Sequence, residues 1–259
     1  MKISVITTTY NSEETLADTL NCISKQVHPD IEHIVVDGHS KDGTLKIVDQ
    51  YAHVAHCISE PDDGIYDAMN KGIKRCTGDV IGILNSDDIY ASSDILVKVA
   101  SIFSDNQVDC LYGDLDFVSW DQLDKVVRHW KAGDYDPRKW YRGWMPPHPT
   151  FFVRKEIYNR LGLFNLHFKS SADYELMLRY LLKNHLQVYY LPEVMIKMRY
   201  GGHSTGSLIN RIIANKEDKL AWVINDLKPP IGLRLLKPVR KIGQYRLRPL
   251  FRSNPQKGF

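Results

Sequence analysis

The feature that most constrains the fold is an alternation of apolar runs and helix-patterned segments in the first half of the chain. The apolar runs, rich in β-branched residues, occupy residues 2–8, 31–36, 56–59 and 80–84. The segments between them repeat their apolar side chains at helical spacing. Strands that alternate with helices predict a parallel sheet with right-handed crossovers, so we expect an α/β fold.

The first helix of this series is expected to follow Asn11. Asn11 is a candidate N-cap, and Glu14 lies three residues later, as in a variant of the capping box. Leu16, Leu20 and Ile23 then keep the spacing of a helix with one apolar face.

Polar residues follow every predicted strand, namely Thr9, Asp37, Glu60 and Asp87. The carboxyl ends of parallel strands lie along one edge of the sheet, where open α/β folds bind ligands. The run Asn85-Ser86-Asp87-Asp88 is unusual, because adjacent carboxylates repel each other unless a cation or hydrogen-bond donors offset the charge. A solvated turn is the alternative explanation, since Asn, Ser and Asp are common in turns.

The two common nucleotide-binding fingerprints, GxGxxG and GxxxxGK[ST], are both absent from the chain. Their absence argues against a dinucleotide-dependent dehydrogenase and against a P-loop enzyme. Without a glycine loop to hold a diphosphate, a metal ion bound by carboxylates is the natural means of neutralising it.

The composition is that of an ordinary globular protein. The 259 residues are 43% hydrophobic and 25% charged, enough for one large α/β domain or two small ones. The four cysteines form no CxxC pair, which indicates reduced thiols rather than a disulfide framework or a zinc site. The N-terminus does not have the pattern of a signal peptide, and no apolar stretch is long enough for a membrane span.

The net charge of +3 is unevenly distributed. Residues 227–259 contain nine Lys or Arg and no Asp or Glu, which leaves 25 basic against 31 acidic residues in the rest of the chain. Apolar side chains are interleaved with these basic residues, and Pro238 and Pro249 prevent one long helix. This pattern favours binding to an anionic membrane surface over binding to nucleic acid. A solvated tail or a subunit contact is the remaining alternative.

Four blocks of the sequence resemble the family 2 glycosyltransferases, over roughly residues 1–205. The blocks are SVITTTYNSEETLADTL, HIVVDGHSKDGT, EPDDGIYDAMNKGIKRCTGDVIGILNSDD and SADYELMLRYL. The resemblance implies a GT-A fold and transfer of a sugar from a nucleotide-diphosphate donor, usually with inversion. It is strongest to the bacterial enzymes that build capsule, O-antigen and exopolysaccharide. The third block ends in Asn85-Ser86-Asp87-Asp88 instead of a literal DXD motif, so the metal assignment depends on its final aspartates.

The resemblance assigns the donor side to residues of the first three blocks. Asp88 would bind Mg²⁺ or Mn²⁺, and Asp87 would face the ribose or the outer coordination sphere of the metal. The remaining positions would bind the nucleotide sugar: Thr9, Tyr10, Asn11, Asp37, Asp62, Asp63 and Lys71. Asp37 is expected to bond the base, with a turn or capping aspartate as the alternative. A solvated helix lysine is the alternative for Lys71.

The resemblance also gives the second half of the chain an acceptor side. Asp173 matches the general base at a helix N-terminus, and Glu175 is the alternative if the helix begins differently. Arg179 is expected to contact the diphosphate or to form a surface ion pair. His148, in the rigid run WMPPHPTFF, would bond a sugar. His203, in the loop RYGGHSTGS, would add a metal or phosphate contact.

These expectations divide the chain into a nucleotide-sugar half (residues 1–115), an acceptor half of the same domain (116–208) and a basic amphipathic segment (209–259). The donor would be a UDP-, GDP- or dTDP-sugar, and the acceptor a glycan or a lipid-diphosphate-linked glycan. We expect a cytoplasmic protein on the inner face of the plasma membrane that does not bind nucleic acid. A sugar nucleotidyltransferase should carry a glycine-arginine loop near the first strand, which is missing. A non-catalytic binding protein should lack the base or the metal carboxylates.

Overall fold

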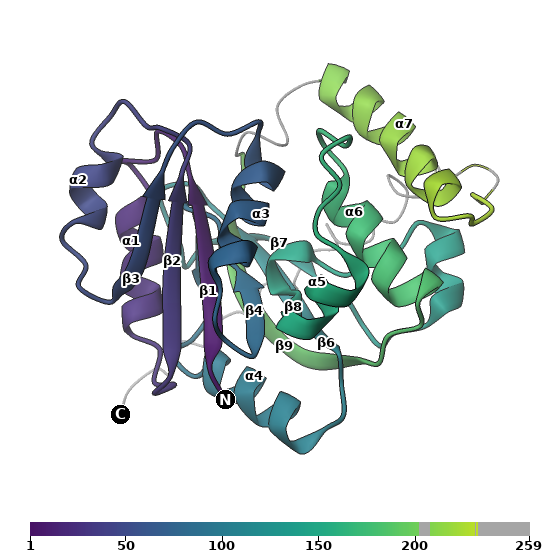
Figure 1. Cartoon of the computed structure of the whole chain (residues 1–259), viewed down its shortest axis with the longest axis horizontal. Coiled ribbons are helices and arrows are strands. Elements are labelled where there is room, and N and C mark those ends of the chain that lie inside the picture. Colours follow the sequence, from purple (N-terminus) through teal and green to yellow (C-terminus); the bar gives the residue numbers. More distant parts are fainter. Residues whose placement is uncertain (202–207, 231, 233–259) are drawn as a thin grey trace, which may run out of the picture.

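A computed structural model of the protein describes residues 1–201, 208–230 and 232. These residues form a nine-stranded sheet covered by helices (Figure 1). The strands run in the order β3-β2-β1-β4-β8-β6-β9-β5, and β7 pairs with β6 outside this path. The predicted α/β class is therefore confirmed.

The first half of the sheet contains the four strands that the sequence predicts, to within a residue or two at each end. They are parallel: β1 (Ile3–Thr9), β2 (Ile31–Asp37), β3 (Val54–Ser59) and β4 (Val80–Ile83). Strand β1 is buried along its whole length, because it lies inside the sheet and is covered on both faces.

The second half of the sheet is mixed. Its strands are β5 (Asp88–Tyr90), β6 (Cys110–Val118), β7 (Val126–Trp130), β8 (Phe152–Arg154) and β9 (Val188–Arg199). Strand β8 runs antiparallel between β4 and β6, and β6 pairs in parallel with β9. Strand β6 crosses residues 115 and 116, so the two predicted halves share one continuous sheet.

Helices cover the two faces of the sheet. Helices α3 (Ile65–Arg75), α5 (Lys155–Leu161) and α6 (Ala172–Met177) share one apolar core with the sheet. Helices α1 (Leu16–Ser24) and α4 (Ile95–Asp105) share another. The remaining helical segments are α2 (Thr44–Val48), η1 (Pro137–Arg142), η2 (His148–Thr150), the π-helical η3 (Leu178–Lys183) and α7 (Leu208–Ile224).

The prediction that Asn11 caps the first helix is wrong. Helix α1 begins only at Leu16, and Asn11 has a left-handed backbone conformation with a φ of 48°. Its backbone N–H donates to Ser40 Oγ, and its side-chain Oδ1 accepts from the N–H of Lys41. The chain therefore first joins the loop after β1 to the loop after β2, and only then starts the helix.

The four cysteines are free thiols, as predicted. Burial raises the pKa of Cys22 and of Cys76 to about 12, so both thiols stay protonated and unreactive at neutral pH. In the described part of the chain, no helix combines the length and the apolar content that crossing a bilayer requires.

Candidate active site

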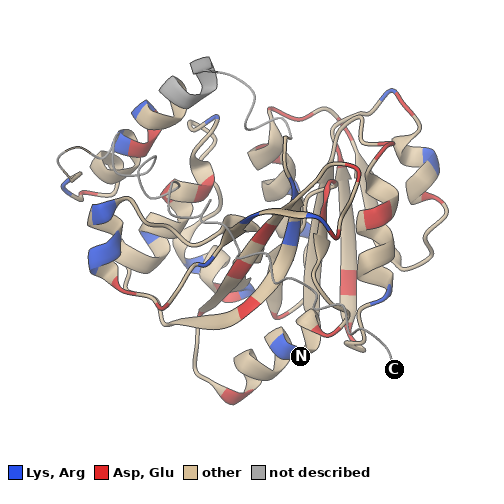
Figure 2. Ribbon diagram, turned by 180° about the vertical axis from the view of Figure 1, so that it is seen from behind, with Lys and Arg blue, Asp and Glu red and all other residues tan. Residues whose placement is uncertain are grey.

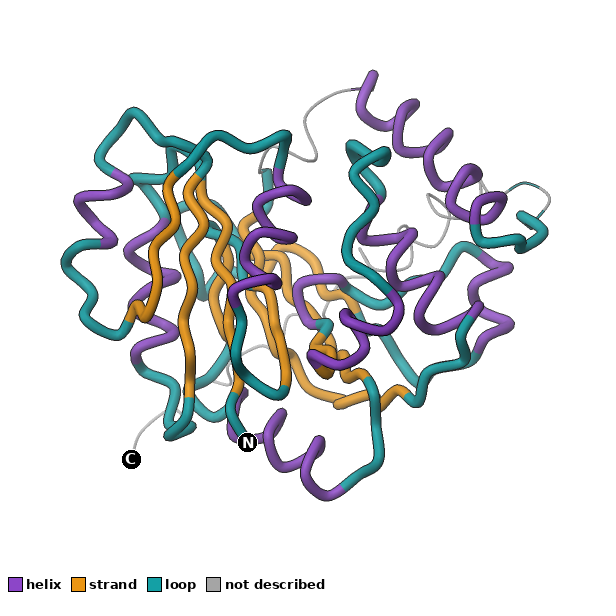
Figure 3. The backbone as a smooth tube through the Cα atoms, in the orientation of Figure 1, coloured by secondary structure: helices purple, strands orange, loops and turns teal. Residues whose placement is uncertain are grey.

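The carboxyl ends of the first three parallel strands meet at one edge of the sheet, the upper edge in Figure 3. In the strand register Thr9 lies beside Asp37, and Asp37 beside Ser59. The Asp37 carboxylate is fully covered and accepts hydrogen bonds from Ser40 N (3.0 Å), Ser40 Oγ and Ser59 Oγ (2.6 Å). Since the carboxylate is covered, a nucleotide base could bond to it only if neighbouring groups moved aside.

Tyr10 and Asp62 come together over Gly38, the residue after Asp37. A Cβ atom on Gly38 would lie 2.5 Å from Asp62 Oδ2 and 3.3 Å from Tyr10 Cδ2, so this approach requires glycine. The Tyr10 side chain is 59% exposed, which leaves its ring available for stacking. Asp63 is also exposed at this edge, and its backbone N–H donates to Asp67.

Lys71 is not arranged to bind phosphate. Its ammonium group contacts Pro61 O at 2.7 Å, Glu60 at 3.1 Å and Asp67 at 3.2 Å. Although desolvation lowers the pKa of Lys71, its bonds to the two carboxylates raise it above the usual range. These contacts occupy its three donors and fasten α3 to the loop after β3, so the expected phosphate contact has no free donor here.

Asp88 is wholly buried at the start of β5, whereas Asp87 is partly exposed. Burial, followed by the neighbouring charge of Asp87, raises the pKa of Asp88 well above its usual range. Its Oδ2 accepts a long hydrogen bond of 3.3 Å from Asn85, and its Oδ1 has no hydrogen-bond partner among the described residues. A buried carboxylate oxygen of this kind needs a proton or a cation.

We call residues 85–88 the acidic loop. Arg199, at the carboxyl end of β9, holds this loop in place, and its role was not predicted from the sequence. Its side chain is 5% exposed and donates to Asp87 O (2.9 Å), to Trp120 O (3.1 Å) and to the Asp18 carboxylate. From α1, Thr19 Oγ1 donates to Asp88 O at 2.8 Å. The acidic loop is therefore fixed by elements far apart in the sequence.

The acidic loop fits a divalent cation that is completed by a substrate. Mg²⁺ is usually held by one or two carboxylates together with substrate phosphates and water, and Asp87 with Asp88 supplies such a pair. Within the residues that the structure describes, no three His, Cys, Asp or Glu side chains form a group that could hold a metal alone. His203, the predicted additional ligand, lies outside the described residues.

Asp173 lies in the first turn of α6 and is bonded to a residue of the opposite half of the chain. Its Oδ1 accepts a hydrogen bond of 3.0 Å from the hydroxyl of Tyr66 in α3. Burial and the charge of Asp173 raise the pKa of Tyr66 well above its usual range, so the phenol stays protonated and can donate. Nothing in the sequence pairs these residues, which are 107 positions apart.

His148 belongs to the same group of side chains. Phe164 lies between Tyr66, which stacks on it with ring centroids 5.5 Å apart, and His148, which meets it edge-on at 5.5 Å. Burial lowers the pKa of His148 and outweighs the opposing charge of Asp173, so the imidazole is neutral at pH 7. A neutral imidazole can donate one hydrogen bond to a sugar hydroxyl and accept another from one.

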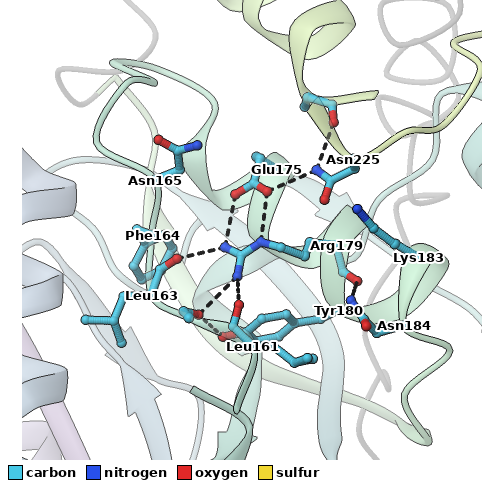
Figure 4. Close-up of polar contacts among 12 residues, drawn as sticks. Leu161, Leu163, Phe164, Asn165, Glu175, Arg179, Tyr180, Lys183, Asn184 and Asn225 are labelled. Atoms are coloured by element: carbon cyan, nitrogen blue, oxygen red, sulfur yellow. Dashed lines mark hydrogen bonds and ion pairs between the residues drawn. The ribbon is translucent and has the colours of Figure 1, made fainter. Parts of the chain in front are cut away.

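Arg179 forms an ion pair, which was the alternative to a contact with the diphosphate, but the pair is largely buried and not on the surface (Figure 4). Its guanidinium donates to both carboxylate oxygens of Glu175, and its remaining N–H groups donate to main-chain carbonyls. These are the carbonyls of Leu161, Gly162 and Leu163. All five N–H groups are thereby used.

Glu175 is correspondingly unsuited to be the alternative base. Its side chain is 2% exposed, and in addition to Arg179 it accepts a hydrogen bond of 3.0 Å from Asn225. Asp173, which is partly exposed, remains the candidate base.

Comparison with known proteins identifies the family of this chain and its relatives. The family model described as glycosyl transferase family 2 matches residues 4–162. A PGL/p-HBAD biosynthesis glycosyltransferase of Mycobacterium bovis is 28% identical over 80% of both chains.

Two solved structures share the fold, which confirms the expected GT-A architecture. S. aureus TarS 1–349 in complex with UDP-GlcNAc matches with a TM-score of 0.64 and 22% identity over 88% of this chain and 68% of that one. Of the longer TarS structure this chain spans 41%. The mannosyltransferase PcManGT of Pyrobaculum calidifontis, in complex with GDP-Man and Mn²⁺, matches with a TM-score of 0.63 and 20% identity over 93% and 69% of the two chains. The family match covers more than half of the sequence, and the chain belongs to glycosyl transferase family 2.

Proposed function

We propose that this glycosyltransferase moves a sugar, with inversion, from a nucleotide-diphosphate donor to a hydroxyl group of a glycan acceptor in bacterial surface polysaccharide synthesis. The observation that carries the proposal is the position of Asp173. It is a partly exposed carboxylate, bonded to Tyr66 of the α3 helix that follows the nucleotide-side loop. Inverting transfer needs one such base to take the acceptor proton as the hydroxyl attacks.

In the proposed reaction the acceptor oxygen bonds to the anomeric carbon as the bond to the nucleoside diphosphate breaks. Asp173 takes the proton of the attacking hydroxyl, and the Tyr66 hydroxyl orients the carboxylate that receives it. Tyr10 and Asp62 lie on the side where we place the nucleotide, and neutral His148 on the side of the sugars. Asp87 and Asp88 would hold Mg²⁺ or Mn²⁺, which when bound neutralises charge on the leaving diphosphate.

The donor class is supported by the neighbours in fold, of which one binds UDP-GlcNAc and another binds GDP-Man with Mn²⁺. The acceptor we propose is a glycan linked to a lipid diphosphate, which fits the basic and apolar composition of residues 227–259. We place the reaction at the inner face of the plasma membrane. The basic segment expected to bind there lies mostly outside the described residues.

A panel of UDP-, GDP- and dTDP-sugars tests the proposal, assayed with Mn²⁺, with Mg²⁺ or with excess EDTA. We expect the nucleoside diphosphate to be released from one donor class, and EDTA to abolish the release. Formation of a nucleoside triphosphate from pyrophosphate would instead identify a nucleotidyltransferase. Binding of a donor without turnover under every condition would identify a non-catalytic binding protein.

A further inference from the structure

Helix α7 presents an unusual outward surface. Between residues 213 and 224 every exposed side chain is either apolar or a lysine: Ile213, Lys216, Lys219, Leu220, Val223 and Ile224. The four apolar side chains are 38%, 44%, 55% and 42% exposed in that order. Large apolar side chains gathered on one helix face indicate an interaction site. We call these six residues the outer face of α7.

The acidic residues of the helix are turned away from the outer face. The Glu217 carboxylate accepts the backbone N–H groups of Lys169, Ser170 and Ser171 at 2.8 to 2.9 Å. Asp218 is buried, with 5% exposure. The exposed acid that follows the helix, Asp226, is paired with Lys183 at 3.0 Å. The outer face is therefore positively charged as well as apolar.

The inner face of α7 is fixed to the helix that carries the candidate base. Trp222 is fully buried, and its indole N–H donates to the Tyr174 hydroxyl at 2.8 Å. One turn later Asn225 donates to Glu175 at 3.0 Å. Tyr174 and Glu175 directly follow Asp173 in α6, so α7 and the base form one packed unit, as Figure 1 shows for the two helices.

Basic residues extend the charge of the outer face. Segment η1 packs against α7 through Tyr141, whose ring centroid lies 4.9 Å from that of Trp222. It exposes Arg142, whereas the charge of Arg138 is paired with Asp136 at 2.8 Å. Figure 2 shows Lys and Arg on both elements. In the sequence, residues 227–259 that follow α7 include nine basic residues and no acidic one.

We propose that the outer face of α7, extended by η1, binds an anionic lipid surface. A helix with exposed apolar side chains beside lysines is the pattern of interfacial helices, whose apolar residues enter the headgroup region while the basic residues bind anionic lipids. A second copy of the chain fits less well, because symmetric pairing of this face would bring like charges together. This deepens the proposed function by placing the Asp173 helix beside a membrane that holds the acceptor.

Sedimentation with lipid vesicles tests the proposal on the full-length protein. The vesicles contain phosphatidylcholine alone or phosphatidylcholine with phosphatidylglycerol, at low and at high salt. We expect binding to the anionic vesicles that weakens with salt. Lys216→Glu with Lys219→Glu, and separately Leu220→Ser with Val223→Ser, should each weaken this binding by about tenfold or more.

Two matched control variants change exposed residues on other helices. Lys46→Glu with Lys74→Glu, on α2 and α3, is the control for the charge reversal, and Val97→Ser, on α4, is the control for the apolar-to-serine change. We expect the controls to bind as the wild type does, and thermal unfolding to show that all variants are folded. Wild-type binding by both α7 variants would overturn the proposal and leave the basic tail as the lipid contact. Unchanged lipid binding together with loss of a dimer, measured by sedimentation velocity, would overturn it in favour of self-association. Lipid binding needs no turnover, so vesicle binding without donor turnover would refute only the proposed function.

Discussion

At the scale of single residues, the candidate active site depends on contacts between side chains that are distant in the sequence. Asp173 lies at the start of α6, yet its hydrogen-bond donor comes from α3. Tyr66 and His148 both contact the Phe164 ring, so one aromatic side chain positions both polar groups. Sequence patterns could suggest Asp173 and His148 individually, because each lies in a distinctive block. They could not suggest Tyr66, since only the folded chain brings it to the base.

Replacing Tyr66 by Phe tests its positioning role. The ionised Asp173 carboxylate would lose a hydrogen bond, and bonds to charged groups contribute about 1.5–3 kcal/mol. We expect kcat/KM to fall by about tenfold or more and the acidic limb of its pH profile to move to higher pH. Donor affinity should be unchanged. Tyr51→Phe, which removes a hydroxyl bonded to Ala17 O, is the control. An unmoved acidic limb would show that Tyr66 acts only in packing.

His33 makes folding stability depend on pH. Its ring is fully buried, between the Thr7 hydroxyl and the ring of His53, and burial lowers its pKa to about 3. An unfolded His has a pKa of about 6.5, so below that value only the unfolded chain takes up this proton. We expect this group to remove about 2 kcal/mol of the unfolding free energy between about pH 7 and about pH 5.

Urea unfolding at several pH values measures this dependence. His33→Gln should flatten it over that interval, although it lowers stability at neutral pH. His167→Gln, at an exposed histidine, is the control and should leave the slope unchanged. Equal slopes for the wild type and His33→Gln would contradict the assignment.

At the scale of helices and strands, the sequence predicted what depends on local periodicity. Strands β1 to β4 were found because each is a compact apolar run between helices. Strands β5 and β7 were not, because such short strands form only by pairing with β9 and β6. The same limitation explains Arg179, whose partner carbonyls lie 16 to 18 residues earlier in the chain. A spacing argument could place Arg179 in the helical segment after Asp173, here η3, but could not identify these acceptors.

Arg179→Met should destabilise the fold rather than weaken donor binding. The substitution leaves Glu175 buried without its cation and removes a donor from three carbonyls, of which that of Gly162 keeps the Tyr180 hydroxyl. Breaking a buried pair in this way costs about 3–5 kcal/mol. Lys183→Met, which removes a largely exposed pair with Asp226, should cost at most about 1 kcal/mol. Chemical unfolding compares the unfolding free energies of the two variants. If Arg179→Met had normal stability but reduced donor affinity, Arg179 would instead be assigned to the diphosphate.

At the scale of the whole molecule, one sheet brings the proposed donor side and the proposed acceptor side together. The parallel strands β1 to β3 end beside one another and carry the nucleotide-side residues. Arg199 of β9 bonds to the acidic loop after β4, so the last strand of the chain stabilises the proposed donor side. On the acceptor side, α7 locks onto α6 through Trp222 and Asn225. The overall sheet could be predicted from motifs, but these fastenings between its two ends could not.

The most direct test of the central claim compares donor binding with turnover in Asp173→Asn. The amide has nearly the same shape as the carboxylate and still accepts the Tyr66 hydrogen bond, but it cannot take the acceptor proton. We expect the melting temperature and the affinity for the nucleotide-sugar donor to match those of the wild type, while transfer falls by about 10²- to 10⁴-fold. Transfer at the wild-type rate, or a loss confined to donor affinity, would contradict the assignment of Asp173 as the base of glycosyl transfer.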